Sequence, residues 1–532
     1  MNVIPPSIFN DVIGPIMRGP SSSHTAAAVR IGTIVRQFLG NPCRRLLVEF
    51  APHGSLATTY KSQGSDIGLV GGLIGMELTD DRLVNALDIA RNNGIKVTFK
   101  ITDFEASHPN TYRISATTGE KGAPEFRFSF ISTGGGMIEL TSINGIPISV
   151  SGGYHEAIFF VNTSLVSNAS RLEEKIIGMH PEIDTCRVSS SGQSALVNIK
   201  TAQPAGAEII DNIRGLVNYA HLVQLAPVLP VHSRKSISVP FKNASELLLA
   251  ASTGNKELWE LALLYESQRS NLAEEQILRM GKEVLAAMKG SIEEGLSGTV
   301  YSNRILGPQA AKVLNHNGAL IGGSLIKNLI AYITAAMETK SAMGVIVAAP
   351  TAGSCAGLPG TLFAAAEDLG SDDTAILKGL LAAGITGILI INHSTFAAEE
   401  CGCQAECGSG SAMTAAGLVQ MAGGTVETAL SAASMAMQNI IGMICDPVAN
   451  RVEVPCLGKN ILAGMNAVAS ANMALCGFDQ VIPFDETIAA FDQAGRMIPA
   501  ELRCTGKAGL SVTPTSLRIH KKLNLPEYEN EA

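Results

Sequence analysis

The 532-residue chain exceeds the size of a single hydrophobic core, so we expect roughly two to four domains. Its net charge of −8, without a basic cluster, gives no support for nucleic acid or an acidic membrane surface as a partner. Aromatic residues make up only 5% of a chain with 53 glycines, a composition typical of globular proteins whose helices pack closely. We therefore expect an enzyme that acts on a small molecule.

The N-terminal residues 1–6 lack a basic region followed by an apolar core, so the sequence predicts no signal peptide and a cytoplasmic location. The most apolar run, 379–391, has 13 residues, fewer than the ~20 that cross a bilayer, and indicates a buried helix. Ten cysteines in such a chain favour reduced thiols with metal-binding or catalytic roles over disulfides.

Residues 1–152 are predicted to form an α/β unit. Ser21 to His24 precede a helical pattern over 25–39, which the Gly-Asn-Pro sequence at 40–42 ends, so the serines are predicted to cap this helix. Free backbone N–H groups and hydroxyls at a helix start can bind a carboxylate, although the same pattern is typical of an ordinary cap. His24 lies in the first turn, where the helix dipole should lower its pKa and favour the neutral imidazole that acid–base catalysis uses.

Residues 153–230 are predicted to form a small α+β unit in the order strand, helix, strand, strand, helix, with a last strand near 221–226. Residues 231–240, which contain Pro240, are predicted to be a linker. From 241 to 532, long helical patterns broken by Gly and Pro predict a mostly α domain. The chain is thus predicted to be a multidomain protein.

Half of the cysteines fall within one stretch of the C-terminal domain: Cys401, Cys403, Cys407, Cys445 and Cys456. Thiolates gathered from separate loops are typical of iron–sulfur clusters, because soft sulfur ligands suit iron. Three thiolates would leave one iron open to act as a Lewis acid on a substrate hydroxyl. The spacing matches neither the paired cysteines of zinc sites nor a ferredoxin, so buried structural thiols and a zinc site remain alternatives.

Longer motifs are more specific than this spacing. They are AAPTAGS at 348–354, GCQAE at 402–406, CDPV at 445–448, VEVPC at 452–456 and GPSSSHT at 19–25. The first four resemble the catalytic alpha domain of the iron–sulfur-dependent L-serine dehydratases, and the fifth resembles their beta domain. The resemblance covers nearly the whole chain, and it implies both domains fused in one chain. The unit between them resembles an ACT regulatory domain.

The resemblance implies dehydration of L-serine to aminoacrylate, which gives pyruvate and ammonia without pyridoxal phosphate. The substrate's hydroxyl and carboxylate would bind the open iron of a 4Fe-4S cluster while a base removes the α proton. We expect a small-molecule amino-acid substrate, no nucleic acid or membrane partner, and a homodimer. The implied cluster ligands are Cys403, Cys445 and Cys456, with Cys355, Cys401 and Cys407 as additional thiols.

The catalytic histidines that the resemblance implies are His24 and His108. A third family histidine, in the motif GHGTD, is replaced by Gln63 in SQGSD at 62–66, and glutamine cannot take up a proton at neutral pH. The nearby His53 is the predicted replacement. The predicted substrate-binding residues are Ser21, Ser22, Ser23, Thr25, Gln63, Asp66, Asn110, Thr351 and Arg451.

Two arginines also depart from the family pattern. Arg451 follows Asn450 where relatives have Gly-Leu, and Arg304 lies in NRILG at 303–307, where a Gly-rich motif is lost. Because arginine binds carboxylates with two hydrogen bonds, one hypothesis is a larger β-hydroxy acid substrate with a second anionic group. Surface or ion-paired arginines are the alternative. Two further alternatives are a related lyase that expels sulfide from L-cysteine and a non-catalytic regulatory or binding homologue.

Two regulatory features of relatives are missing from the sequence. ACT domains usually carry Asp-x-Pro-Gly in the first loop, whereas this chain has NTSLV at 162–166, which favours a structural or dimerising role over effector binding. Some relatives close the open iron with a cysteine in the C-terminal tail, and the tail at 524–532 has none. Cys504 is the remaining late candidate for a fourth ligand. Glycines 134–136 also resemble a family motif, although a triplet of glycines is equally typical of a turn.

Overall fold

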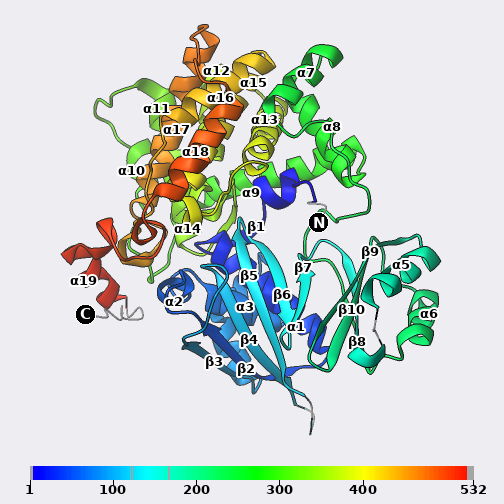
Figure 1. Ribbon diagram of the computed structural model, residues 1–532. Helices are drawn as coiled ribbons and strands as arrows, with labels where there is room; N and C mark the ends of the chain where they lie inside the picture. The colour runs from blue at the N-terminus through cyan, green and yellow to red at the C-terminus, as the bar shows by residue number, and fades with distance from the viewer. Residues whose placement is uncertain (1–3, 120–121, 123, 166–167, 524–532) are drawn as a thin grey trace.

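The computed structural model describes residues 4–119, 122, 124–165 and 168–523. Figure 1 shows a helical body, made mainly by the C-terminal half, above two β-sheets made by the N-terminal half. This arrangement confirms the predicted mixed α/β N-terminal part and the mostly α C-terminal part. The predicted loop at 162–166 lies partly outside the described residues, and the tail at 524–532 lies wholly outside them.

The larger sheet has the strand order β3-β2-β4-β5-β6-β7. Strands β2 and β3 pair in parallel, and the other neighbours pair antiparallel. Burial alternates along β5 and over the first half of β6, as expected for a sheet with one covered face. The strands are β2 (Cys43–Phe50), β3 (Lys96–Ile101), β4 (Thr111–Thr118), β5 (Phe126–Gly134), β6 (Met137–Ile143) and β7 (Ile146–Val150).

Helices α1 (Ala27–Leu39) and α3 (Ser65–Leu73) pack against each other and cover this sheet (Figure 1). Their close approach requires glycine, because a Cβ atom at Gly72 would lie 2.0 Å from the carbonyl oxygen of Val29. A Cβ atom at Gly68 would likewise lie 2.5 Å from the carbonyl oxygen of Thr25, so the start of α3 lies beside the turn that leads into α1. The shorter elements of this part are η1 (Ile8–Val12), β1 (Ile16–Arg18), η2 (Ser22–Ala26), α2 (Leu56–Thr59), η3 (Asp81–Asn85) and α4 (Ala86–Asn92).

The predicted helix over 25–39 begins later than the sequence indicated. Element η2 is a π-helical turn, and the α-helix begins only at Ala27. The hydroxyl of Ser21 makes no capping bond to the backbone, because it is bound to the imidazole of His24 instead. The prediction that the serines cap this helix is therefore wrong. Gly40 ends the helix in a left-handed conformation, with φ of 63°.

The smaller sheet confirms the predicted order of elements in the middle of the chain. Its strands are antiparallel in the order β11-β8-β10-β9, and helices α5 and α6 share an apolar core with them. The elements are β8 (His155–Asn162), η4 (Thr163–Leu165), α5 (Ala169–Met179), β9 (Ile183–Ser191), β10 (Ser194–Thr201), α6 (Ala207–Val217) and β11 (His221–Leu225).

The helical body surrounds α13 (Asp373–Ile391), which begins at the N-cap Asp372 and confirms the buried helix predicted over 379–391. By length and composition α13 could cross a membrane, but 78% of its apolar window is buried inside the protein, as in the core helix of a folded domain. The other helices are α7 (Ala244–Gly254), α8 (Leu258–Ser270), α9 (Glu274–Ser297), α10 (Ala310–Leu314), α11 (Gly323–Ser341), α12 (Gly357–Leu369), α14 (Ala398–Cys401), α15 (Ser409–Met421), α16 (Val426–Gln438), α17 (Cys456–Leu475), α18 (Phe484–Met497) and α19 (Pro514–Lys522).

The first residues of the chain pack into this helical body. Strand β1 pairs antiparallel with β12 (Val345–Val347), with Ile16 opposite Val347. The hydroxyl of Ser7 donates a hydrogen bond to a carboxylate oxygen of Glu266 at 2.7 Å, and η1 packs on α13. The two halves of the chain therefore meet over a buried interface, and the motif at 19–25 lies directly after the β1–β12 pairing.

Candidate active site

The cysteines of the three C-terminal motifs come from different elements. Cys403 lies between α14 and η6 (Gln404–Gly408), Cys445 lies in the loop after α16, and Cys456 begins α17. All three are buried. The sulfur atoms of Cys403 and Cys445 and a carboxylate oxygen of Glu406 lie within 4.8 Å of one another.

One pocket brings this thiol cluster together with the N-terminal serine motif. Ser21 and Gln63 reach it from the N-terminal half, and Cys445 and Cys456 reach it from the helical body. The site is therefore built at the interface of the two halves, as the two sets of motifs require. The complete lining is Ser21, Ser23, Gln63, Gly353, Ala398, Glu399, Glu406, Cys445, Pro447, Val452, Cys456 and Cys504.

The donors in this pocket are compatible with a metal cluster. Hydrogen bonds with the thiols of Cys403 and Cys504, ahead of burial, raise the pKa of Cys445 well above its usual range. Thiols packed so closely are hard to ionise alone, and a bound soft cation removes that difficulty. Burial alone would lower the pKa of Lys459, but the nearby Cys403, Cys456 and Cys445 raise it above its ordinary value. A permanent positive charge therefore lies beside the thiols and favours their thiolate form.

Cys504 belongs to the same group of sulfur atoms. Its backbone N–H donates to the carbonyl oxygen of Cys445 at 3.1 Å, and the N–H of Cys445 donates to the carbonyl oxygen of Leu502 at 2.8 Å. Cys504 has a left-handed φ of 61° and packs with Cys403 and Cys445. Gln63, which replaces the family histidine, donates its side-chain N–H to the sulfur of Cys504 at 3.7 Å. The residue that replaces the family histidine is thus in contact with the candidate fourth ligand.

Two carboxyl groups that had no predicted role also line the pocket: Glu399 is buried and Glu406 is partly buried. The hydroxyl of Thr351 donates to Glu406 at 2.6 Å, and burial raises the pKa of Glu406 to about 7. A Cβ atom at Gly353 would lie 2.5 Å from the same carboxylate, so glycine is required there. Glu399 accepts a hydrogen bond from the hydroxyl of Ser23 at 2.8 Å. Their position beside Cys403 in the sequence was the available signal.

His24 is fully buried, with none of its surface exposed. Its Nδ1 atom lies 3.0 Å from the hydroxyl of Ser21 and 3.8 Å from a carboxylate oxygen of Glu399, and its Nε2 atom lies 2.8 Å from the hydroxyl of Thr59. Burial lowers the pKa of His24 to about 4, against the opposing effect of Glu399. The imidazole is therefore neutral, as predicted, but the cause is burial and not the helix dipole.

This neutral histidine makes the protein sensitive to acid. An unfolded chain protonates its histidine near pH 6.5, whereas folded His24 resists protonation down to about pH 4. Its contribution to the free energy of unfolding is therefore complete above pH 6.5 and is lost as the pH falls towards 4, by about 3 kcal/mol. Urea denaturation of the wild type and of His24→Gln, from neutral pH to pH 4, measures this loss. Equal pH dependence in both proteins would contradict it.

The remaining predicted residues differ in their relation to the pocket. His108 contacts Glu400 at 3.4 Å and is partly buried, whereas His53 is exposed and is not among the lining residues, so its prediction as a replacement base is wrong. Thr25 donates to the backbone carbonyl of Gln63 at 2.8 Å. The other three are not among the lining residues: the hydroxyl of Ser22 accepts from the backbone of Ala352, Asp66 accepts from the backbone of Ile67, and Asn110 is fully buried.

Arg451 is committed to partners within the protein, contrary to its expected role in substrate binding. Its guanidinium donates to Glu453 at 3.0 Å, to the carbonyl oxygen of Ser62 at 3.3 Å and to that of Asn303 at 2.7 Å. Arg304 in turn donates to the hydroxyl and carbonyl oxygens of Thr299. Arg451 is therefore ion-paired, Arg304 is hydrogen-bonded to Thr299, and neither is among the residues that line the pocket.

Arg451→Met should act on stability and not on substrate affinity. The change leaves the carboxylate of Glu453, which is 1% exposed, without its ionic partner, and breaking a buried pair costs about 3 kcal/mol. Thermal and urea denaturation measure this loss, with the exposed Arg279→Met as the matched control. A raised KM for the substrate at unchanged stability would instead assign Arg451 to binding.

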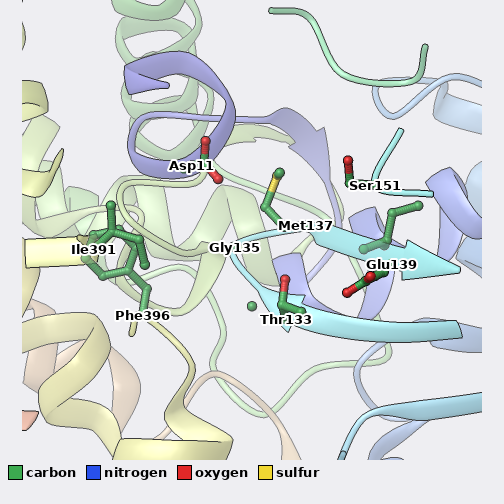
Figure 2. Close-up of a pocket in the computed structure, with 10 residues that line it drawn as sticks. Asp11, Thr133, Gly135, Met137, Glu139, Ser151, Ile391 and Phe396 are labelled. Atoms are coloured by element: carbon green, nitrogen blue, oxygen red, sulfur yellow. The ribbon is translucent and has the colours of Figure 1, made fainter. Parts of the chain in front are cut away.

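A second hollow of about 210 Å³ lies at the predicted glycine motif. Gly134, Gly135 and Gly136 all have positive φ and form the turn between β5 and β6. Figure 2 shows Asp11 of η1 and Phe396 of the helical body around this turn. The glycines thus serve a turn at the interface of the two halves, apart from the cysteines.

A pocket lined by thiols and two carboxyl groups, with a buried neutral histidine directly behind Ser21, defines a candidate metal-dependent enzyme. Residues 253–511 match the family model described as serine dehydratase alpha chain. The chain is 36% identical over 285 residues to a probable L-serine dehydratase alpha chain of Bacillus subtilis, an alignment that spans 53% of this chain and 95% of the relative.

Two other relatives extend the match to the N-terminal half. A probable L-serine dehydratase beta chain of Bacillus subtilis is 36% identical over 222 residues, which span 41% of this chain and 98% of the relative. L-serine dehydratase 1 of Escherichia coli is 25% identical over 510 residues, which span 93% of this chain and 96% of the relative. The chain belongs to the L-serine dehydratase family, with the alpha-type and beta-type parts fused, as the motifs indicated.

Proposed function

We propose that the protein is an iron–sulfur-dependent L-serine ammonia-lyase that converts L-serine to pyruvate and ammonia. The observation that carries the proposal is the single pocket in which the thiols of the alpha-type part meet the serine–histidine motif of the beta-type part. The names of the relatives support the substrate, because they are L-serine dehydratases. The chemistry of the thiols supports the cofactor.

Cys403, Cys445 and Cys456 would hold a 4Fe-4S cluster, with Cys504 as an additional thiol beside them. When bound, such a cluster supplies a Lewis acid that makes the substrate hydroxyl a better leaving group. The protein's own residues supply the rest of the chemistry. His24 is a neutral base at physiological pH, and Glu399 beside it would stabilise the positive charge that the imidazole acquires.

The surroundings of the pocket keep these groups in place and exclude water. Thr351 holds Glu406 against the thiol cluster, and Ser23 holds Glu399 beside His24. The pocket walls come from buried segments of both halves, so charges that develop during the reaction are poorly screened by solvent. Binding of L-serine between the two halves would complete the site.

A comparison of substrates tests the proposal. Anaerobically purified protein should form pyruvate from L-serine faster than from L-cysteine. It should be nearly inactive on a β-hydroxy amino acid with a second carboxylate, because Arg451 and Arg304 are occupied. Faster release of sulfide from L-cysteine would favour the related lyase. No turnover of any of the three by iron-loaded protein would favour a non-catalytic homologue.

We further infer that the middle unit, 153–230, is an ACT-like domain with a structural or dimerising role in a cytoplasmic homodimer. Its β-α-β-β-α-β order supports this assignment. Light scattering on the full chain should give the mass of a dimer. Calorimetric titration of substrate-free protein with amino acids should show binding at one site per chain, the active site. Binding at a second site per chain would favour an effector role for the middle unit.

A further inference from the structure

The hydrogen bonds of Thr59 determine which nitrogen of His24 carries the proton. The hydroxyl of Thr59 has one hydrogen, which it donates to the backbone carbonyl of Ser55 at 2.6 Å. Its oxygen must therefore accept the hydrogen bond from His24 Nε2, at 2.8 Å. Since the imidazole is neutral, Nε2 holds the ring proton and Nδ1 holds a free electron pair.

The two serines on the other side of the ring have different roles. Ser21 and Ser23 place their hydroxyl oxygens 3.0 and 3.1 Å from Nδ1 of His24. The hydrogen of Ser23 is donated to Glu399 at 2.8 Å, so Ser23 has none to give to the imidazole. The hydroxyl oxygen of Ser21 lies 3.3 Å from that of Ser23 and 3.0 Å from Nδ1. Nδ1 is the nearer acceptor, and of the two serines Ser21 is the one whose hydrogen is free to reach it.

Ser21 also separates the histidine from the pocket. Ser21 and Glu399 line the pocket together with Cys445 and Cys456, whereas His24 has no exposed surface. A proton that leaves a molecule in the pocket must cross a side chain to reach Nδ1. Ser21 is already hydrogen-bonded in the direction that such a transfer needs.

We propose that Ser21 is a catalytic residue that relays the α proton of the substrate to His24. The proposal deepens and rests on the proposed lyase function. The Cα–H bond of L-serine breaks and its proton passes to Ser21 Oγ, while the proton of Ser21 passes to His24 Nδ1. The electron pair of the Cα–H bond forms the Cα=Cβ bond, and the Cβ–O bond breaks to release hydroxide. The imidazolium returns its proton to Ser21 Oγ while Ser21 gives its own proton to the hydroxide, which leaves as water, so that Ser21 and His24 return to their starting state.

This role differs from the carboxylate binding that the sequence suggested for Ser21. A hydroxyl that binds a carboxylate must donate its hydrogen to it, but Ser21 already has Nδ1 of His24 as an acceptor at 3.0 Å. Glu399, 3.8 Å from Nδ1, is placed to stabilise the imidazolium and would repel a substrate carboxylate bound at Ser21. Both observations favour proton transfer over anion binding at this residue.

Kinetics of Ser21 variants separate the two roles. Ser21→Ala should lower kcat by about 10²- to 10⁴-fold with little change in KM, and Ser21→Thr, which keeps a hydroxyl, should recover much of the loss. The kinetic isotope effect on kcat with C2-deuterated L-serine should increase in Ser21→Ala, because removal of the α proton becomes slower than the other steps. A raised KM with unchanged kcat and isotope effect would overturn the relay and restore carboxylate binding.

Thr59 offers a second test away from the substrate. Thr59→Val removes the acceptor of the Nε2 proton, so the relay predicts a lower kcat at unchanged KM and a larger isotope effect, and Thr59→Ser should behave like the wild type. Full activity of Thr59→Val in a folded protein would contradict the assignment of the proton to Nε2. The wild type serves as the control for function, because a wild type that forms no pyruvate would contradict the lyase proposal itself. If the wild type is active and Ser21→Ala is fully active, only the relay by Ser21 is contradicted.

Discussion

Replacing Cys445 by alanine is expected to give a folded, colourless protein that binds no iron and forms no pyruvate from L-serine. Cys445 lies at the centre of the thiol group, hydrogen-bonded to both Cys403 and Cys504, and its backbone is tied to residues 502 and 504. Losing this thiolate leaves at most two of the proposed ligands, too few for a cluster. Iron and sulfide analysis, the visible spectrum and circular dichroism of anaerobically purified protein measure the outcome.

Two matched variants make this prediction specific. Cys476→Ala removes an exposed cysteine at the end of α17 and should leave the iron content and the spectrum unchanged. Cys504→Ala removes the additional thiol and should retain a cluster, since Cys403, Cys445 and Cys456 remain. Normal iron content in Cys445→Ala would contradict the proposed ligand set. Loss of the cluster only in Cys504→Ala would show that Cys504 is a ligand and that Cys445 is the additional thiol.

His24→Gln is expected to lower kcat by about 10²- to 10⁴-fold, the usual contribution of a general base. Glutamine keeps hydrogen-bonding groups in the space of the imidazole but cannot take up a proton. KM should change little, because His24 has no exposed surface and does not line the pocket. Steady-state kinetics with L-serine measure both constants.

The matched control is His53→Gln, at the exposed histidine that the sequence had suggested as a replacement base. It should retain wild-type kcat and KM. Equal activity of His24→Gln and the wild type would contradict the role of His24 as the base. A large loss of activity in His53→Gln would instead support His53 as the replacement base, as the sequence suggested.

Local patterns in the sequence were sufficient to predict much of the secondary structure. Alternating and helical periodicities predicted the elements of the middle unit and the buried helix α13, and Gly40 predicted the end of α1. The start of α1 was not predictable in this way, because the hydroxyl of Ser21 bonds to His24 and the turn is π-helical. The pairing of β1 with β12 joins strands more than 300 residues apart, and three residues carry too weak a pattern to reveal it.

In the site, too, the residues within local motifs could be predicted, whereas contacts between residues far apart in the sequence could not. The motifs identified cysteines and serines that the fold brings to one pocket, with His24 directly behind Ser21. The role of Glu399 depends on a hydrogen bond from Ser23, 376 positions away in the chain. Arg451 was assigned to the substrate because arginine binds carboxylates, but the carboxylate it binds is Glu453 of the same loop. The neutral state of His24 was predicted for the wrong reason, since burial was not visible in the sequence.

The most direct test of the central claim is L-serine-dependent pyruvate formation by anaerobically purified wild-type protein, with iron, sulfide and the visible spectrum measured on the same sample. The proposed function predicts a brown, iron-loaded protein that forms pyruvate and ammonia in equal amounts and loses activity in air. An iron-loaded protein that is inert on L-serine would contradict the assigned substrate, and a protein that stays colourless after anaerobic reconstitution would contradict the cluster itself.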